Sequence, residues 1–278
     1  MPILGAVSQP ARGAFRFGKP RMPEWVEYLV IAGGGGSNGA GAGGAGGYRS
    51  SVVGESSGRN SSAESRLTPA EDTNYTVTIG AGGGSTPTNN GSPTTFASIT
   101  STGGGGWTNS PDSSGGYGNS GGSGGGSTAW LGPYDIATRS RSGPSGTSGQ
   151  GFNGGAAYVN SGDGQHTGAY AGGGGAGGNG GNASQTGHGN SYGSYGPGLS
   201  SSITGTSVLR AWGNGSGRPD DVANTGCRAQ SGVVILRFPS GSRLPTVGAG
   251  LTYSAANSDS TYTVLEFTAG SDSIVWES

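Results

Sequence analysis

Long glycine blocks alternate with short hydrophobic segments along this chain, and this alternation constrains the fold more than any other feature. Glycine accounts for 65 of the 278 residues, and its largest blocks occupy 33–47, 103–126 and 172–189. Because ordering glycine costs more backbone entropy than ordering any other residue, a folded glycine block needs many cooperative contacts. The blocks argue against an ordinary α/β enzyme and against a coiled coil. Three alternatives remain: an ordered glycine array, disordered linkers, or a β-sandwich with long glycine loops.

The hydrophobic segments between the blocks are typical of β-strands, because they are short and rich in β-branched and aromatic residues. The segment 231–238 (SGVVILRF) is apolar on both faces, which predicts a central strand covered on both sides. The segments 261–267 and 273–277 flank TAGSD and predict a hairpin with a five-residue loop. The remaining predicted strands are 25–32, 75–79, 94–100 and 207–212.

The glycine blocks can order as left-handed extended helices with three residues per turn and a rise of about 3.1 Å per residue. Such a helix has no internal hydrogen bonds, so its N–H and C=O groups must pair with neighbouring helices, and the missing Cβ allows the approach. Ala42 and Ala45 interrupt one track of the block 33–47, so we expect rods mixed with irregular segments. We predict a mostly β fold with almost no helix: a glycine-rich, β-sandwich-like domain with polyglycine-type extended rods and long loops.

The glycine blocks and the strands occur in a recognisable order. The series VEYLVIAGGGG, GAGAGGAGGYR, YTVTIGAGGG, GSPTTFASITSTGGGGW, GGGGAGGNGG and SGVVILRFP lies within residues 25–239. It resembles the glycine-rich domain of bacteriophage tail-fibre and other virion proteins, notably those of cyanobacterial and marine phages. The C-terminal TYTVLEFTAGSDSIVWE resembles a hairpin that precedes this domain in such proteins. Here it follows the domain, which suggests that it pairs back onto the domain or onto a neighbouring subunit.

The resemblance implies a protein of the virion, made in the host cytoplasm. We expect a tail-fibre or fibre-tip protein, a homotrimer without enzymatic activity, that contributes to attachment to the host surface, with a cell-surface glycan as candidate receptor. The alternative is a purely structural virion protein, such as a decoration protein, an adaptor or a connector between baseplate and fibre, with no receptor binding. The expected parts are a docking arm (1–24), the glycine-rich domain (25–239) and a C-terminal β-hairpin segment (240–278).

The arm carries a local excess of positive charge, since Glu24 is its only acidic residue. Two interpretations stay open: a solvated tail, or an arm that orders on an acidic surface of other virion proteins. The candidate docking residues are Arg12, Phe15, Arg16, Phe17, Lys19 and Arg21.

Aromatic residues and arginines among the glycines are the candidate receptor contacts. Rigid aromatic rings on adaptable Gly/Ser/Asn segments offer a large contact area at low entropic cost. The alternative is that many of these rings fill a core that has little else to fill it. The aromatic residues concerned are Tyr48, Trp107, Tyr117, Trp130, Tyr134, Tyr158, Tyr170, Tyr192, Tyr195 and Trp212. The predicted contacts are Trp130, Tyr134, Arg139 and Arg141 in the segment 128–141, then Tyr192 and Tyr195, with Trp107 and Tyr117.

No motif points to catalysis, a cofactor or a metal. The segment 34–39 matches G-x-G-x-x-G, but no helix can follow it to receive a pyrophosphate. The segment 13–19 is close to a phosphate-binding loop, but Pro20 stands where Ser or Thr would bind the metal. The residue types that bind zinc are few and scattered, namely His166, His188 and Cys227.

Nucleic acid and membrane are also disfavoured as partners. A glycine-rich RNA-binding protein could stack bases on its GYG-type segments, but this chain has a pI of about 6.1 and Lys19 is its only lysine. The longest apolar runs fall far short of the roughly 20 residues of a membrane span. We therefore expect neither nucleic-acid binding nor membrane insertion.

Overall fold

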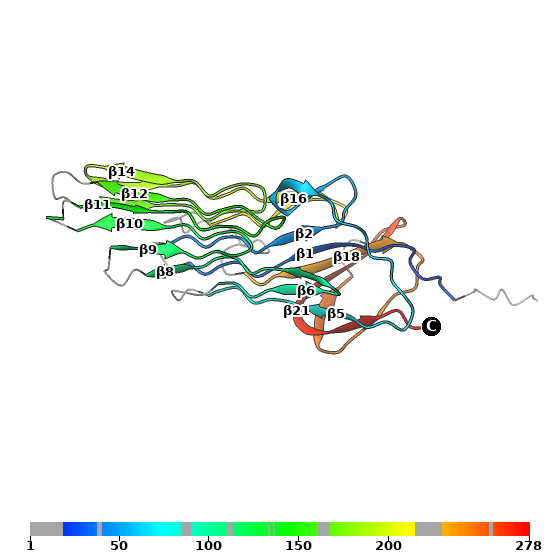
Figure 1. Ribbon diagram of the computed structural model, residues 1–278. Helices are drawn as coiled ribbons and strands as arrows, with labels where there is room; N and C mark the ends of the chain where they lie inside the picture. Colours follow the sequence, from blue (N-terminus) through cyan, green and yellow to red (C-terminus); the bar gives the residue numbers. More distant parts are fainter. Residues whose placement is uncertain are drawn as a thin grey trace, which may run out of the picture.

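The computed structural model describes residues 19–37, 41–84, 90–109, 114–132, 134–135, 137–160, 167–214, 230–255 and 258–278. Within them the chain consists of β-strands and extended segments, and the 3-10 turn η1 (Gly58–Asn60) is the single helical element. The molecule is elongated, with a large sheet at one end, which we call the base, and smaller sheets at the other, which we call the distal end (Figure 1). The prediction of a mostly β fold is confirmed.

The base sheet contains nine strands and nearly closes on itself. The side-chain hydroxyl of Ser101, in the last strand of the path, donates at 2.8 Å to the carbonyl of Val30, in the second strand of the path. The path runs β2 (Tyr48–Ser50), β1 (Glu27–Ile31), β18 (Val233–Pro239), β21 (Tyr262–Val275), β5 (Tyr75–Thr78), β6 (Thr94–Phe96) and β7 (Ile99–Ser101), and β19 (Thr246–Val247) and β20 (Leu251–Ser254) pair with β21.

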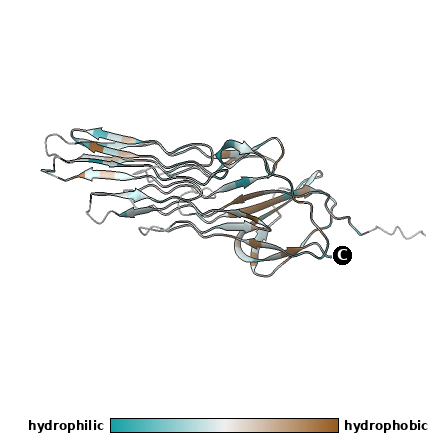
Figure 2. Cartoon of the chain, in the orientation of Figure 1, coloured by the Kyte–Doolittle hydropathy of each residue, from teal (hydrophilic) through white to brown (hydrophobic). Residues whose placement is uncertain are grey.

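β18 is the central strand of the base and is covered on both faces, as predicted. Val234 and Leu236 contribute to one hydrophobic cluster, together with Trp276, while Val233 and Ile235 contribute to another on the opposite face. Figure 2 shows the hydrophobic colour concentrated in these base strands and largely missing from the glycine segments. The base therefore supplies the apolar burial that the glycine segments cannot supply.

Glycine segments run side by side between the base and the distal end (Figure 1). They bond to one another with a period of three residues: the amides of Ala32 and Gly35, for example, donate to Gly47 and Gly44 at 3.0 and 2.9 Å. Pairs of amides three apart that likewise share one acceptor segment are Ser123 and Gly126, Gly124 and Ser127, Ala171 and Gly174, and Gly173 and Ala176. A chain with three residues per turn faces the same neighbour at every third residue. The blocks are therefore ordered polyglycine-type rods.

The rods lie so close together that a side chain would not fit between them. A Cβ atom added at Gly105 would lie 1.9 Å from the carbonyl oxygen of Asn119, and one at Gly35 would lie 2.1 Å from that of Gly105. Ala42 and Ala45, which were expected to interrupt a track, are both buried and three residues apart. Their carbonyls accept from Gly126 and Ser123, so these alanines belong to the rod and do not break it.

Two sheets packed face to face form the distal end. The distal sheet has the order β15 (Gly189–Tyr192), β13 (Thr167–Tyr170), β10 (Thr128–Leu131), β9 (Gly115–Gly118) and β8 (Trp107–Asn109). The second sheet has the order β11 (Thr138–Arg141), β12 (Ala157–Asn160) and β14 (Ala183–Thr186). A small cluster of alanine, valine and leucine side chains lies between them. Two short hairpins complete the fold: β3 (Ser56–Ser57) with β4 (Ser61–Ser62), and β16 (Leu199–Ser201) with β17 (Val208–Arg210).

Two sequence predictions of local structure are wrong. The residues 268–272, predicted as a hairpin loop, lie inside the single strand β21, which pairs with β18 over its first half and with β5 over its second. The segment 94–100, predicted as one strand, folds back as β6 and β7, with Ala97 in the turn at φ 53°. The C-terminal segment does pair back onto the domain, as one of the two stated alternatives expected.

The first described residues lie beside the C-terminus at the base. The Lys19 ammonium donates to the carbonyl of Ser278 at 3.3 Å, and the Arg243 amide donates to the carbonyl of Arg21 at 2.7 Å. Both chain ends of the described structure are therefore at the base, and the rods carry the distal sheets away from them (Figure 1).

Candidate functional site

Along β10 of the distal sheet, neighbouring side chains differ in exposure, and this decides whether Trp130 reaches the surface. In β10, Trp130 is 37 % exposed, whereas Ala129 and Leu131 on either side of it are buried. Ala129 and Leu131 pack against Val159 of the second sheet. Because side chains alternate along a strand, the Trp130 face points away from the second sheet.

Three aromatic residues from adjacent strands share this outer face. Trp130 in β10 lies opposite Gly168 in β13, and Asn190 in β15 lies opposite Gly168 on its other side. Tyr170 in β13 lies opposite Tyr192 in β15. Paired residues, and residues two apart along a strand, have their side chains on the same face. We call Trp130, Tyr170, Asn190 and Tyr192 the aromatic strip.

The strip is held in place by contacts among its own members. The rings of Tyr170 and Tyr192 stack with their centroids 5.3 Å apart and an interplanar angle of 16°, and Asn190 Nδ2 donates to the Tyr192 hydroxyl at 3.3 Å. A Cβ atom at residue 168 would lie 2.6 Å from Tyr170 Cε2, so glycine there lets the Tyr170 ring lie across β13. Burial, and secondarily the neighbouring Tyr192, raises the pKa of the Tyr170 hydroxyl, so the Tyr170 ring is neutral at pH 7.

Sequence reasoning found half of this strip. Trp130 and Tyr192 were predicted contacts, and the structure places them on one face of one sheet. Tyr170 and Asn190 were not among the predicted contacts. A signal for Tyr170 exists in the sequence, because TGAY and GNSY place a tyrosine at the same position of two four-residue strands.

Tyr134 and its loop lie next to β10 rather than on the strip. Tyr134 is 92 % exposed with φ 71°, so its ring is open to solvent. Asp135 accepts from Arg139 Nη2 at 2.8 Å and from the Ala137 amide at 3.0 Å. The hydrogen bond from Arg139, followed by that from the amide, lowers the pKa of the Asp135 carboxyl. Arg139 therefore closes this loop as an ion pair.

Trp107 is a core residue, which corrects its prediction as a receptor contact. It is 4 % exposed, and its ring is enclosed by two glycines, since a Cβ atom at Gly41 or at Gly116 would overlap it. Its indole N–H donates to Thr128 Oγ1 at 3.2 Å. Trp107 therefore fills the space between a rod and the distal sheet, as the alternative interpretation of these aromatics expected.

Arg141 also requires correction, because it is 6 % exposed. Its Nη2 donates to Ser114 Oγ at 2.7 Å, and its guanidinium lies 4.1 Å from the ring centroid of Tyr117. Tyr117 is 49 % exposed. Its neighbour Gly116 lies opposite Thr128, on the Trp130 face, so Tyr117 belongs to the other face of the distal sheet. Tyr117 and Arg141 thus lie on the opposite side of the sheet from the aromatic strip.

The remaining predicted residues are dispersed. Tyr195 is 45 % exposed and lies beyond the end of β15. Lys19 and Arg21 are exposed at the base. The other docking candidates, Arg12, Phe15, Arg16 and Phe17, lie outside the described residues, as do His166 and Cys227, whereas His188 is exposed between β14 and β15.

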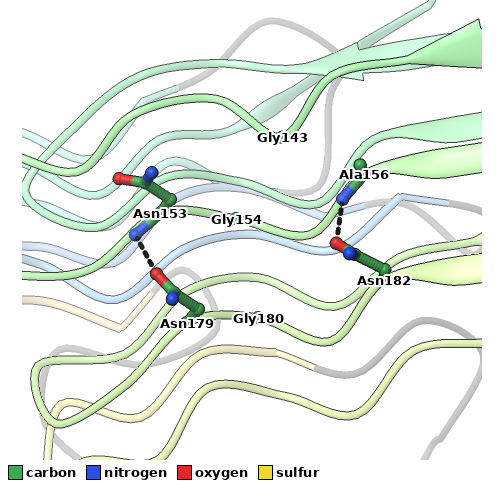
Figure 3. A pocket seen from close by; sticks show the side chains of 7 residues that line it. All are labelled: Gly143, Asn153, Gly154, Ala156, Asn179, Gly180 and Asn182. Carbon is green, nitrogen blue, oxygen red and sulfur yellow. Dashed lines mark hydrogen bonds between the residues drawn. The ribbon is translucent and has the colours of Figure 1, made fainter.

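An open groove of about 310 Å³ lies between neighbouring rods and is lined by glycine, Ala156 and three asparagines (Figure 3). The side-chain oxygens of Asn179 and Asn182 accept from the amides of Asn153 and Ala156 at 3.1 and 2.8 Å. These pairs again follow the three-residue period, so the asparagines complete the hydrogen bonding of a rod at the edge of the array. The chemistry of this groove is explained by rod packing.

The described ranges hold neither a metal-binding cluster nor a helix that could span a membrane. No group of three or more His, Cys, Asp or Glu side chains in that part of the chain could hold a metal ion. No helix there is long and apolar enough to cross a bilayer.

Comparison with known proteins identifies the family. No curated protein and no solved structure matches the chain significantly. The family described as a glycine-rich domain matches residues 9–239, which include the rods, both distal sheets and the strands β1 and β18. The chain therefore belongs to the glycine-rich domain family.

Proposed function

We propose that this chain is a tail-fibre or fibre-tip protein of a bacteriophage and that its distal end contacts the surface of the host cell. The observation that carries the proposal is the polarity of the molecule. Both described chain ends are at the base, and exposed aromatic residues gather at the far end of the rods. A protein that is held at one end and binds at the other needs this arrangement.

The rods support the proposal through their stiffness. A flexible linker of the same length would move its tip over a wide volume, whereas rods bonded to one another keep the distal sheets at a fixed distance and orientation from the base. Such a spacer suits attachment, because a pre-organised contact surface loses less entropy on binding.

The proposal includes the remaining expectations from the sequence. The arm 1–24 docks on other virion proteins, the assembled form is a homotrimer, and the protein is made in the host cytoplasm and acts in the virion without catalysing a reaction. A purely structural virion protein, such as a decoration protein or a connector, is the alternative, and it would share the rods but bind no cells.

Cell adsorption tests the proposal. The fluorescently labelled full chain is mixed with a panel of cyanobacterial and other marine bacterial isolates, and binding is measured by flow cytometry. We expect binding to a subset of isolates, and weaker binding by Tyr134→Ala at the distal loop. Leu244→Ala serves as the matched control, because Leu244 is also an exposed hydrophobic residue, at 61 %, but belongs to the base.

Immunogold labelling of virions completes the test. Gold at the ends of fibres, together with adsorption, supports the proposal. Gold along the capsid or the tail shaft, with no adsorption to any isolate, supports the structural alternative.

A further inference from the structure

We infer that the aromatic strip (Trp130, Tyr170, Asn190 and Tyr192) is a binding site for a neutral oligosaccharide. The inference rests on the proposed function, because it names the receptor chemistry of the same distal end. It assigns that chemistry to one face of the distal sheet rather than to the loops or to the groove of Figure 3.

The aromatic strip exposes flat ring surface to solvent. Tyr192 is 57 % exposed and Trp130 is 37 % exposed, although both belong to one paired sheet whose other face supplies a hydrophobic cluster. A ring that is rigid and partly exposed offers a flat, polarisable surface on which the C–H groups of a pyranose can pack. The stack of Tyr170 on Tyr192 prevents the exposed Tyr192 ring from collapsing onto the sheet.

The spacing of Trp130 and Tyr192 suits an oligosaccharide. Trp130 and Tyr192 lie on β10 and β15, which are separated by one strand, β13. Two strand spacings amount to about 10 Å, which is comparable with the length of a short oligosaccharide. The strip can therefore contact two sugar rings of one chain at once, one on each aromatic residue.

Polar groups of Asn190 and Tyr192 lie among the rings. Asn190 is exposed, and its side-chain amide uses one N–H on the Tyr192 hydroxyl, which leaves a second N–H and an acceptor oxygen. The Tyr192 hydroxyl accepts that bond and keeps its own O–H to donate. A few polar groups fixed among aromatic surface are what a ligand with hydroxyls on its rim requires.

The charge of the strip limits the kind of ligand that it fits. The strip contains no Asp, Glu, His, Lys or Arg residue, and the ion pair of Arg139 belongs to a loop that it closes with Asp135. A nucleic acid or an acidic glycan would need cationic groups to offset its charge. The strip therefore fits a neutral saccharide better than either of these ligands.

A glycan array tests the inference without cells. The labelled full chain is applied to immobilised neutral oligosaccharides of glucose, mannose, galactose and N-acetylglucosamine, with sialylated and uronic-acid oligosaccharides alongside. We expect binding to at least one neutral oligosaccharide and a loss of about tenfold or more in Trp130→Ala and in Tyr192→Ala. Tyr117→Ala is the matched control, since Tyr117 is an exposed tyrosine on the opposite face of the same sheet.

Several results would overturn the inference: no binding to any neutral oligosaccharide, binding confined to acidic ones, or equal binding by the strip variants and the wild type. Circular dichroism and thermal melting of each variant separate lost binding from lost folding. If Trp130→Ala is unfolded, the decision passes to Trp130→Phe, which keeps an apolar ring, and to Asn190→Ala at the exposed rim.

Cells treated in two ways distinguish this inference from the proposed function. Periodate destroys vicinal diols of surface glycans, and proteinase K removes surface proteins. Adsorption that is lost after periodate and kept after proteinase K supports the inference. Adsorption with the reverse pattern overturns it and leaves the proposed function standing, with a protein as receptor. Binding to the array without adsorption to any cell supports the inference and contradicts the proposed function.

Discussion

At the scale of single residues, the rods require glycine for its missing Cβ and not for a left-handed backbone. Among the described residues of 33–47 and 121–126, no glycine has a positive φ, whereas Gly54 and Gly205 in turns do. The rods instead place backbone atoms in the space that a Cβ would occupy, as at Gly105. Substitution by alanine in a rod therefore fails for steric reasons.

We expect Gly105→Ala to lower the free energy of unfolding by about 3 kcal/mol or more, because overpacking forces backbone to move. The added Cβ would lie 1.9 Å from the carbonyl oxygen of Asn119. Urea denaturation followed by circular dichroism measures the change.

Gly132→Ala provides the matched control for Gly105→Ala. The nearest atom to a Cβ at residue 132 is Trp130 Cζ3 at 3.8 Å, and Gly132 is not among the glycines with positive φ. This variant should be neutral or more stable by about 0.5 kcal/mol, since alanine reduces the entropy of the unfolded chain. Equal stability of the two variants would contradict the close packing of the rods.

At the scale of elements, a buried carboxylate joins strands that the chain order separates. Glu27 in β1 is 1 % exposed and accepts from Arg237 in β18 at 2.5 Å and from Arg66 at 2.6 Å. The amide of Val53 donates to the same carboxylate at 3.2 Å. Burial by itself raises the pKa of Glu27, but the hydrogen bonds from Arg237, Val53 and Arg66 outweigh it and hold the pKa below its ordinary value.

We expect Glu27→Gln to cost about 3 kcal/mol of the free energy of unfolding at pH 7, because it leaves two arginines without their anion. Since the pKa of Glu27 is lowered by folding, its contribution is complete above the unfolded value near pH 4.5. The contribution is lost as the pH falls further, through the folded pKa. The difference between wild type and variant should therefore shrink in acid, as measured by urea denaturation from pH 7 down to pH ~3.

Glu71→Gln is the control for Glu27→Gln. Glu71 also pairs with an arginine, Arg243 at 2.8 Å, but its side chain is 49 % exposed. An exposed pair contributes about 0–1 kcal/mol, so this variant should show little change at any pH. A similar loss in both variants would mean that burial of Glu27 is not what makes it important.

At the scale of the whole molecule, the rods and the base form one hydrogen-bonded body. Strand β1 continues directly into the rod that begins at Ala32, and the amide of Gly232, just before β18, donates to Gly80. The glycine segments gain little from hydrophobic burial, so their order depends on the base strands that hold their ends and on the mutual pairing of their backbones.

We expect the amides of 103–106 and 121–126 to exchange with deuterium about as slowly as those of β18, because both would open only with the whole structure. Mass spectrometry of peptides from the labelled full chain measures this. The exposed residues Thr73 and Asn74, just before β5, are the internal reference for rapid exchange. Uptake by the glycine segments as rapid as that of this reference would show that they are not an ordered array.

The sequence by itself determined the fold class, the positions of β1, β5 and β18, and the threefold rods. These depend on local composition: hydrophobic runs seek burial, and a glycine block has few ways other than backbone pairing to become ordered. Tertiary structure alone decided that 262–275 forms one strand, because TAGSD gains partners in β5 and β20 that no local pattern reveals. It also decided that Trp107 is buried while Trp130 is exposed: the strand register places both rings on the same face of the distal sheet, and the glycine segment at Gly41 packs over Trp107.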